Sequence, residues 1–305
     1  MKPAAFDYYA PTTTEEALAL LTEHGYDAKP LAGGQSLIPT MNFRLAQPAV
    51  LVDLNNLPEL AYIEPTDDGG LRIGAMTRQR AIERSPLVAE RAPLLHATMP
   101  YIAHTQIRNR GTLGGSLAHA DPAAELPVIA VTLGAQLKLQ SSAGERWVAA
   151  DEFYIGLFTT DLQAEEIVAE IVLPPQMPRS GWSIQEISRR HGDYAIVGVA
   201  AYVQLDDAGR CQQAKVGLLS VGEGPVQAQG AMALLQGEKP STELIATAAE
   251  QCATHDIDPT ADIHASVAFR RHLAKVLTKR ALDQAFVEAR NNYINECQEG
   301  TLFAE

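Results

Sequence analysis

The chain has 305 residues, enough for two domains, or three small ones, that each have a core of their own. Its formal net charge of −13 argues against nucleic acid as a partner, because phosphate backbones are bound by clustered lysine and arginine. No apolar run reaches the ~18 residues of a membrane span, and the first residues lack the apolar core of a signal peptide, so we expect a cytoplasmic protein without a membrane span.

The first predicted helix spans Thr13 to His24. Thr13 and Glu16 have the spacing of a capping box, leucines give the helix an apolar face, and a glycine ends it. A short strand is predicted at Lys29–Leu31 and a buried strand at Val50–Leu54. The opening part of the chain therefore predicts a small β-α-β unit.

Between these two strands lies a glycine-rich turn, Ala32-Gly33-Gly34-Gln35-Ser36-Leu37. Paired glycines let the backbone adopt positive φ, approach a ligand closely and align successive N–H donors toward an anion. The turn has neither the lysine of a Walker loop nor the third glycine of a dinucleotide fingerprint, so ATPase and nicotinamide-binding folds are poor fits. On its own it could equally be a structural turn between a strand and a helix.

A second turn of the same kind, Gly111-Thr112-Leu113-Gly114-Gly115-Ser116, follows a strand predicted at Leu71–Ala75. Taken alone, it is open to the same structural interpretation. Two such turns, each followed by a plausible helix start, together indicate a diphosphate held from two sides. Ser116, His119 and Asp121 lie too close in sequence to converge as a hydrolase triad, and the chain has no GxSxG motif, so we predict no catalytic residue of that type.

Asp121, followed by a proline, predicts the start of a helix with the aspartate as its N-cap. The same side chain is placed to hydrogen-bond a ribose or adenine group. The helix is expected to end at Leu133, and strands are predicted at Ala135–Gln140 and Ile167–Leu173. Three prolines within Pro174–Pro178 resist both helix and sheet, which places a domain boundary there.

The part of the chain after this boundary changes to a pattern of strands followed by helices. The predicted strands are Ile184–Ser188, Ala195–Leu205 and Ala214–Val221. Helices are predicted at Ser241–Thr254 and Ser266–Asn291. Between the first two strands, Arg189–Tyr194 combines two arginines, a glycine and an aromatic residue; its spacing alone favours an ordinary strand start with exposed arginines.

These patterns predict an α+β protein. Residues 1–176 form one region, divided near residue 56 into subdomains 1–56 and 57–176. Residues 177–290 form a C-terminal domain with a three-stranded antiparallel sheet and packed helices. Residues 291–305 form a tail that is frayed or docked on another chain.

Several motifs occur in a fixed order over residues 1–290: Leu31-Ala-Gly-Gly-Gln-Ser-Leu-Ile-Pro39, Arg44-Leu45 with Pro48, Val52-Asp53-Leu54, Ile73-Gly-Ala-Met76, Gln106-Ile107-Arg108-Asn-Arg-Gly-Thr-Leu-Gly-Gly-Ser116, His119-Ala-Asp-Pro122, and Arg189-Arg190 with Gly192-Asp193-Tyr194. In this order and spacing the chain resembles the flavin-binding medium subunit of the molybdenum hydroxylases. That family contains aerobic carbon monoxide dehydrogenase and bacterial N-heterocycle dehydrogenases, and the same module forms the central part of xanthine dehydrogenase.

The resemblance implies a PCMH-type FAD-binding region of two subdomains, with FAD held noncovalently, and a C-terminal flavoprotein domain that closes one side. Residues 32–36 would wrap the pyrophosphate through backbone N–H groups, and residues 112–116 would do so from the opposite side. Asp121 would reach the ribose region, and Tyr194 would lie near the isoalloxazine ring. Ser116 stands where several relatives have asparagine, which weakens the case for a side-chain contact there. The implied cofactor-binding residues are Lys29, Ala32, Gly33, Gly34, Gln35, Ser36, Leu37, Thr112, Leu113, Gly114, Gly115, Ser116, Asp121, Leu173, Arg189 and Tyr194.

The cysteines bear on the remaining cofactors of such an enzyme. Cys211, Cys252 and Cys297 are scattered, without CxxC spacing or neighbouring histidine pairs, whereas zinc sites and iron–sulfur clusters need clustered ligands. We therefore expect no metal site in this chain. The resemblance then implies that two [2Fe–2S] clusters and a molybdopterin reside on partner chains, an iron–sulfur small subunit and a molybdopterin large subunit, assembled as a dimer of heterotrimers. Electrons would pass through FAD in this chain to an external acceptor.

Two other functions remain open from the sequence. One is a stand-alone FAD-dependent oxidoreductase, which would turn over a substrate by itself. The other is a non-catalytic nucleotide-binding assembly protein, which would hold a nucleotide without a reducible flavin. The substrate of the complex also remains open among carbon monoxide, a purine, nicotine and a quinoline-type heterocycle, as does the final electron acceptor.

Overall fold

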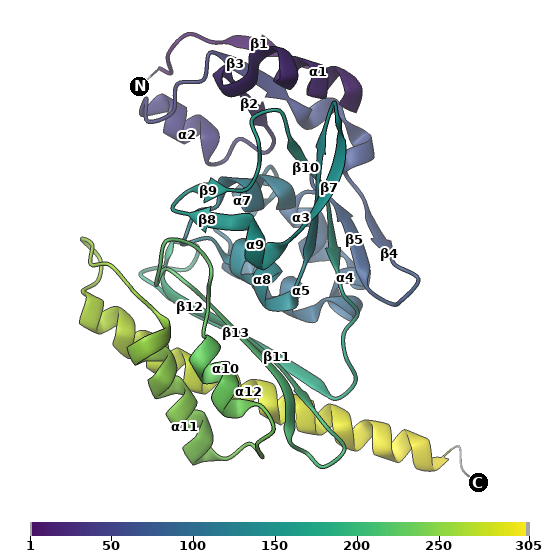
Figure 1. Cartoon of the computed structure of the whole chain (residues 1–305), viewed down its shortest axis with the longest axis vertical. Helices are drawn as coiled ribbons and strands as arrows, with labels where there is room; N and C mark the ends of the chain where they lie inside the picture. Colours follow the sequence, from purple (N-terminus) through teal and green to yellow (C-terminus); the bar gives the residue numbers. More distant parts are fainter. Residues whose placement is uncertain (1, 303–305) are drawn as a thin grey trace. The chain divides into compact units, whose positions relative to one another are not determined.

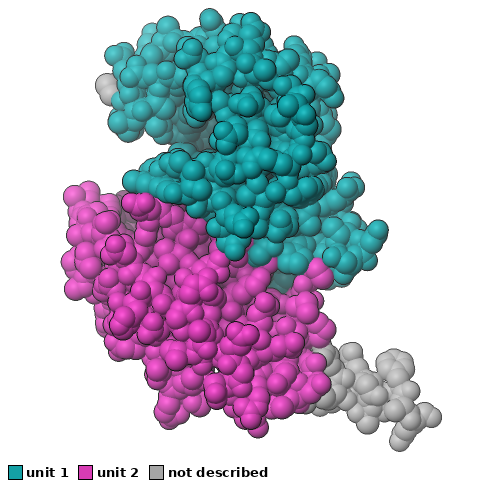
Figure 2. Space-filling view, in the orientation of Figure 1, with its two compact units in different colours: residues 1–120, 134–174 teal, residues 121–133, 175–305 magenta. Residues whose placement is uncertain are grey.

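The computed structural model describes residues 2–302, with side chains described up to residue 292. The chain folds into two compact units, residues 1–120 with 134–174 and residues 121–133 with 175–305 (Figure 2). The segment 121–133 was expected in the N-terminal region and belongs instead to the second unit, because its helix packs on the sheet of that unit. No helix in the described part of the chain is long and apolar enough to cross a membrane.

The first unit begins with a small parallel sheet covered by one helix (Figure 1). Its strands, in spatial order, are β1 (Asp7–Tyr9), β3 (Val50–Asp53) and β2 (Ala28–Leu31). Helix α1 (Thr14–His24) starts as predicted, with the Thr13 side chain accepting a hydrogen bond from the Glu16 N–H, and ends at Gly25 with φ of 51°. Helix α2 (Leu37–Asn42) connects β2 to β3, so the predicted β-α-β unit is confirmed.

The second sheet of this unit is antiparallel and five-stranded. In spatial order its strands are β4 (Ile63–Pro65), β5 (Leu71–Gly74), β10 (Ile167–Leu173), β6 (Gln136–Ser141) and β7 (Gly144–Ala149). A separate hairpin consists of β8 (Tyr154–Gly156) and β9 (Thr159–Thr160). Short helices fill the long connections: α3 (Gln79–Arg84), α4 (Pro86–Arg91), α5 (Pro93–Thr98), α6 (Thr105–Arg108), α7 (Leu113–His119) and α9 (Ala150–Phe153). The strand predicted at Ile167–Leu173 is confirmed and lies at the centre of the sheet.

The second unit is a layered structure of one antiparallel sheet and helices on its faces. The strands follow in chain order: β11 (Ser180–Ser188), β12 (Ala195–Leu205), β13 (Cys211–Leu219) and the two-residue β14 (Val226–Gln227). The helices are α8 (Glu125–Leu133), α10 (Gln229–Leu235), α11 (Thr242–Gln251), a single π turn (Cys252–Asp256) and α12 (Val267–Leu302). The three predicted strands are confirmed, and β14 adds a short fourth.

Strand β12 is buried over all eleven residues, because helices cover both faces of the sheet. Its odd-numbered side chains from Val197 to Leu205 share a core with α10, α11 and α12. On the other face, Gly217 pairs with Ala200 across the sheet and lies against Val128 and Thr132 of α8. Helix α12 runs along β11 and β12 (Figure 1).

Two predicted helix limits in this unit are corrected. Helix α8 starts at Glu125, four residues after Asp121; the Asp121 carboxylate instead accepts a hydrogen bond from the Ala123 N–H at 2.9 Å in a turn that precedes the helix. Helix α12 continues to Leu302 where a tail was expected from residue 291, because no glycine or proline occurs between Val267 and Glu299. Residues 303–305 of that tail lie outside the described residues.

Candidate functional site

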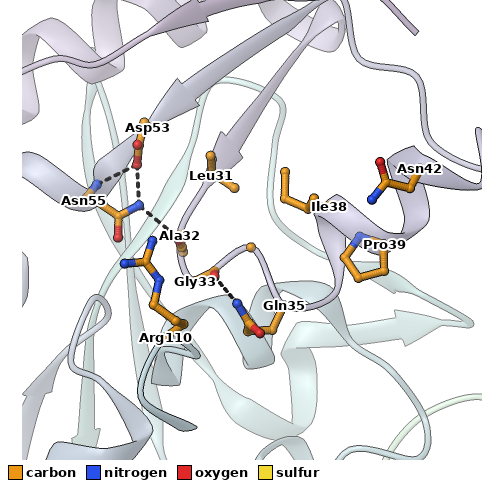
Figure 3. A pocket seen from close by; sticks show the side chains of 11 residues that line it. Leu31, Ala32, Gly33, Gln35, Ile38, Pro39, Asn42, Asp53, Asn55 and Arg110 are labelled. Atoms are coloured by element: carbon orange, nitrogen blue, oxygen red, sulfur yellow. Dashed lines mark hydrogen bonds between the residues drawn. The ribbon is translucent and has the colours of Figure 1, made fainter. Parts of the chain in front are cut away.

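The first unit contains a cavity of about 360 Å³ at the carboxyl ends of β2 and β3. The first glycine turn forms one wall, α2 a second, and the residue before the second glycine turn a third (Figure 3). The lining residues are Leu31, Ala32, Gly33, Gly34, Gln35, Ile38, Pro39, Asn42, Asp53, Asn55 and Arg110. The cavity lies where parallel strands meet the N-terminus of a helix, a common location for phosphate groups in α/β structures.

The first glycine turn offers hydrogen-bond donors without acceptors. The backbone N–H groups from Gly33 to Leu37 have no acceptor within the described part of the chain, and the Ser36 side chain does not cap α2. Gly34 has φ of 71°, a left-handed backbone conformation that favours glycine and that turns the chain between β2 and α2. The turn is held by a 2.9 Å bond from the Gln35 side-chain amide to the Gly33 carbonyl. Five unused donors at the start of a helix fit an anionic group such as a diphosphate.

The second glycine turn differs, because its backbone N–H groups from Leu113 to Ser116 already have acceptors in the chain. Leu113 N–H donates to the Thr77 carbonyl at 3.0 Å, and Gly114 N–H donates to the Ala75 carbonyl at 2.8 Å. The Thr112 hydroxyl accepts the Gly115 N–H at 3.1 Å as the N-cap of α7, and Ser116 N–H donates to the Thr112 carbonyl at 3.3 Å. The backbone N–H groups of this turn therefore hold α7 against the end of β5. The hydroxyl groups of Thr112 and Ser116 are the donors of this turn that a ligand could use.

The glycines serve close packing of one chain segment on another. A Cβ at Gly33 would lie 2.4 Å from the Arg110 carbonyl oxygen and 2.7 Å from Gly111 Cα. A Cβ at Gly115 would lie 2.6 Å from the Thr112 hydroxyl and 3.3 Å from Ala32 Cβ. The paired glycines were expected to admit a ligand; the structure shows that they also let the two turns touch each other.

Gly114→Val should disrupt the first unit even without a ligand. A Cβ at this position would lie 2.4 Å from Ala75 Cβ and 3.0 Å from the Ala75 carbonyl oxygen, so α7 must move away from the end of β5. We expect a loss of about 2–3 kcal/mol in unfolding free energy. Urea unfolding of the variant without cofactor measures it, and an unchanged midpoint would contradict this account of the glycine.

Two other sequence-predicted residues of the first unit lie in its sheets and do not line the cavity. Lys29 is an exposed residue of β2, three positions before the first residue of the first turn. Leu173 is the last residue of β10, with a buried side chain that pairs across the sheet with Leu71.

The remaining predicted residues, Asp121, Arg189 and Tyr194, belong to the second unit. The Arg189 guanidinium donates to the Asp193 carboxylate at 3.1 Å in the turn between β11 and β12. Tyr194 follows this turn with 68% of its surface exposed. Partial burial of its hydroxyl raises the pKa of Tyr194, and the negative charges of Asp121 and Glu125 add to the increase.

Two buried carboxyl groups lie in the same unit. Burial raises the pKa of Glu125, at the start of α8, to about 7. Burial, together with the charge of Glu125, raises the pKa of Glu186 in β11 to about 8. The Glu186 Oε2 atom is buried without a hydrogen-bond partner among the described residues, which indicates a protonated or ligand-facing carboxyl group.

Several residues at the cavity were not predicted as site residues, and Asn55, Arg78 and Arg110 are the ones whose hydrogen bonds and charges matter below. Asn55 and Arg110 line the cavity, and Arg78 lies behind them, with one guanidinium nitrogen 2.5 Å from Asn55 Oδ1. The only signals in the sequence were positional. Asn55 comes two residues after a buried strand, and Arg110 directly precedes a glycine turn.

The described residues contain no group of three or more histidine, cysteine or acidic side chains that could hold a metal ion. Cys211 and Cys252 are buried free thiols, and burial raises the pKa of each to about 12. A thiol of that kind is neutral at physiological pH and is a poor metal ligand.

Comparison with known proteins agrees with these features. Residues 4–176 match the family described as FAD binding domain in molybdopterin dehydrogenase, and residues 182–285 match the CO dehydrogenase flavoprotein C-terminal domain. The chain is 41% identical to the 6-hydroxypseudooxynicotine dehydrogenase complex subunit alpha of Paenarthrobacter nicotinovorans, covering 95% of this chain and 97% of the relative. It is 37% identical to the carbon monoxide dehydrogenase medium chain of Afipia carboxidovorans, covering 95% and 100%.

Solved structures give the same relationship. A chain of carbon monoxide dehydrogenase from Hydrogenophaga pseudoflava matches with a TM-score of 0.91 at 36% identity, covering 94% of this chain and 99% of the other. A chain of quinoline 2-oxidoreductase from Pseudomonas putida 86 matches with a TM-score of 0.89 at 41% identity, covering 95% and 99%. With both of its regions matched and relatives aligned over almost their whole length, the chain belongs to the FAD-binding medium subunits of the molybdenum hydroxylases.

Proposed function

We propose that this chain is the flavin electron-transfer subunit of a heteromeric molybdenum hydroxylase, passing electrons from [2Fe–2S] clusters on a partner chain through FAD to an external acceptor. The observation that carries the proposal is the run of five unused N–H donors from Gly33 to Leu37. Three of these residues, Gly33, Gly34 and Gln35, line a cavity of a size suited to part of a dinucleotide. Those donors fit a diphosphate, and FAD is the diphosphate cofactor of the family.

In this proposal each part of the chain has a separate task toward the cofactor. The first glycine turn, residues 32–37, binds the diphosphate through its N–H groups. Thr112 and Ser116 contribute hydroxyl groups, while Leu113, Gly114 and Gly115 hold that turn in place through their bonds to the end of β5. Lys29, Leu173, Asp121, Arg189 and Tyr194 keep the roles expected from the family resemblance, with Tyr194 near the flavin ring.

FAD would supply the redox chemistry, accepting and releasing electrons. The residues of this chain would bind and orient it, with the unused N–H groups from Gly33 to Leu37 as donors to its diphosphate. No metal-ligand cluster occurs in the described residues, so we assign the iron–sulfur and molybdopterin groups to separate small and large subunits. The proposed assembly is a dimer of heterotrimers.

The relatives' names suggest the range of substrates for the complete enzyme. They include enzymes named for 6-hydroxypseudooxynicotine, caffeine, nicotine and carbon monoxide. Nothing in this chain selects among these, because the substrate would be oxidised on another subunit. We propose an oxidisable small molecule of this range as the substrate of the complex, with the choice made by the large subunit.

The isolated chain should bind FAD and take electrons from an artificial reductant, but should oxidise none of these substrates. The measurement is expression of the chain alone, reconstitution with FAD, and assay with nicotine, a quinoline, a purine and carbon monoxide in the presence of a dye acceptor. Turnover on the order of 1 per second or faster would contradict the subunit assignment and favour a stand-alone oxidoreductase. Tight nucleotide binding without a reducible flavin would favour an assembly protein.

A further inference from the structure

Arg110 is an exposed residue whose side chain lines the cavity and is drawn beside Ala32 of the first glycine turn in Figure 3. Within the described residues its guanidinium makes no hydrogen bond and no ion pair. Arg108, two residues earlier, is the contrasting case. It is buried, donates to both carboxylate oxygens of Glu83 at 2.9 and 3.1 Å, and donates to the Ile102 carbonyl at 2.7 Å. One arginine thus anchors this segment, and the other is left available to a ligand.

The backbone of Arg110 is fixed by a second arginine. Arg78, partly buried, donates from one guanidinium nitrogen to the Arg110 carbonyl oxygen and from the other to Asn55 Oδ1 at 2.5 Å. The Asn55 amide nitrogen in turn donates to the Ala32 carbonyl oxygen at 2.9 Å. This chain of bonds connects the segments that carry Arg110, the end of β3 and the first glycine turn, which together form the cavity.

The charges at this position are not balanced by the protein. Arg78 and Arg110 are close enough that the charge of Arg110, after burial, lowers the pKa of Arg78. Asp53 is the nearby acid, but its carboxylate already accepts bonds from the Tyr8 hydroxyl at 2.5 Å and from the Asn55 N–H at 2.9 Å. One carboxylate, already engaged in two hydrogen bonds, does not offset the charges of two guanidinium groups. An anionic ligand in the cavity would offset them.

We propose that the Arg110 guanidinium binds a phosphate of the FAD diphosphate, and that Arg78 is a positioning residue that holds Arg110 and the first glycine turn at the distance this contact needs. The inference rests on the proposed function, which places FAD in this cavity. Arginine suits the role because its planar donors match phosphate oxygens and its charge strengthens each hydrogen bond.

Arg110→Gln should weaken FAD binding about 10- to 100-fold, the loss expected for a charge-assisted hydrogen bond. The same variant without cofactor should be no less stable to heat than the wild type, because the change removes repulsion with Arg78. The matched control is Arg84→Gln, which removes an exposed arginine of α3 that does not line the cavity. The measurements are flavin fluorescence titration and thermal unfolding of the cofactor-free chain.

ADP and adenosine as competitors identify the group that is recognised. ADP, which carries a diphosphate, should displace FAD from the wild type better than adenosine does, and Arg110→Gln should lose this preference while Arg110→Lys keeps part of it. Equal weakening of both competitors, unchanged FAD affinity, or a cofactor-free variant that melts lower would each overturn the role of Arg110. Failure of the wild type to bind FAD at all would instead refute the proposed function.

Arg78 is tested by its coupling to Arg110. Arg78→Gln should lower both FAD affinity and the stability of the cofactor-free chain, because it releases the Arg110 carbonyl and Asn55 together. In the double variant Arg78→Gln with Arg110→Gln, the loss of affinity should be clearly smaller than the product of the two single losses. Strictly multiplicative losses would show that Arg78 does not act through Arg110.

Discussion

Replacing Gly33 with valine should give a chain that purifies without FAD and unfolds more easily than the wild type. The new Cβ would lie 2.4 Å from the Arg110 carbonyl oxygen and 2.7 Å from Gly111 Cα, and both of these are backbone atoms. Backbone atoms cannot rotate away as a side chain can, so the two segments that form the cavity must separate. We expect a cost of at least about 3 kcal/mol in unfolding free energy. The measurements are the flavin absorbance of the purified protein and urea unfolding without cofactor.

A second glycine of the same unit provides the control. At Gly156, in β8, a Cβ would meet only Thr159 Cβ at 4.0 Å, an ordinary contact, and its φ is not positive. Gly156→Val should therefore keep its FAD and its unfolding midpoint within experimental error. A Gly33→Val protein that is as yellow and as stable as Gly156→Val would show that the two turns are not in the close contact described.

The second unit should lose stability as the pH rises from about 5 to 8. The pKa of Glu125 rises from 4.5 to about 7 and that of Glu186 to about 8. Between the unfolded and folded pKa values, the folded state holds a proton that the unfolded state has released, so raising the pH favours unfolding. Since each pKa unit is worth 1.36 kcal/mol, Glu125 alone would account for on the order of 3 kcal/mol across this range.

Two tryptophans make this effect measurable in the full chain. Trp182 lies in β11 of the second unit and Trp147 in β7 of the first, so Trp147→Phe leaves Trp182 as the reporter. In that background Glu125→Gln should equal the parent near pH 5 and be about 2–3 kcal/mol more stable at pH 8. Its stability should also fall less steeply with pH. Parallel pH profiles of the two proteins would contradict the raised pKa of Glu125.

The sequence was most informative where one segment determines its own structure. Strand β12 was predicted with the correct limits because eleven consecutive residues from Ala195 to Leu205 suit burial on both faces. Helix α1 was predicted from its capping residue and its terminal glycine. The first glycine turn was predicted to bind an anion; its residues 32–35 line the cavity, and the bound anion stays a prediction.

The parts that were missed depend on segments far apart in sequence. Strand β1 has three exposed residues and therefore no alternation of apolar and polar side chains, so only its pairing with β3 makes it a strand. Asn55, Arg78 and Arg110 lie on three segments that are brought together only by the tertiary fold. The pattern of apolar and polar residues in the sequence does not predict such a contact. The second glycine turn was assigned the same donor role as the first, because sequence patterns do not tell whether an N–H group already has an acceptor.

The insertion of residues 121–133 into the second unit has a consequence for how this protein is made. The chain passes from one unit to the other at residues 120/121, 133/134 and 174/175, so neither unit is a single stretch of sequence. Eight of the nine residues of α8 are buried, and the strands that cover them span residues 195–219. During synthesis, more than sixty residues must be added after this apolar helix before the strands that cover it begin. A fragment cut at residue 176, the limit of the first family match, would carry α8 without the strands β12 and β13 that cover it in the whole chain, so expression of that fragment should yield aggregates where the whole chain folds.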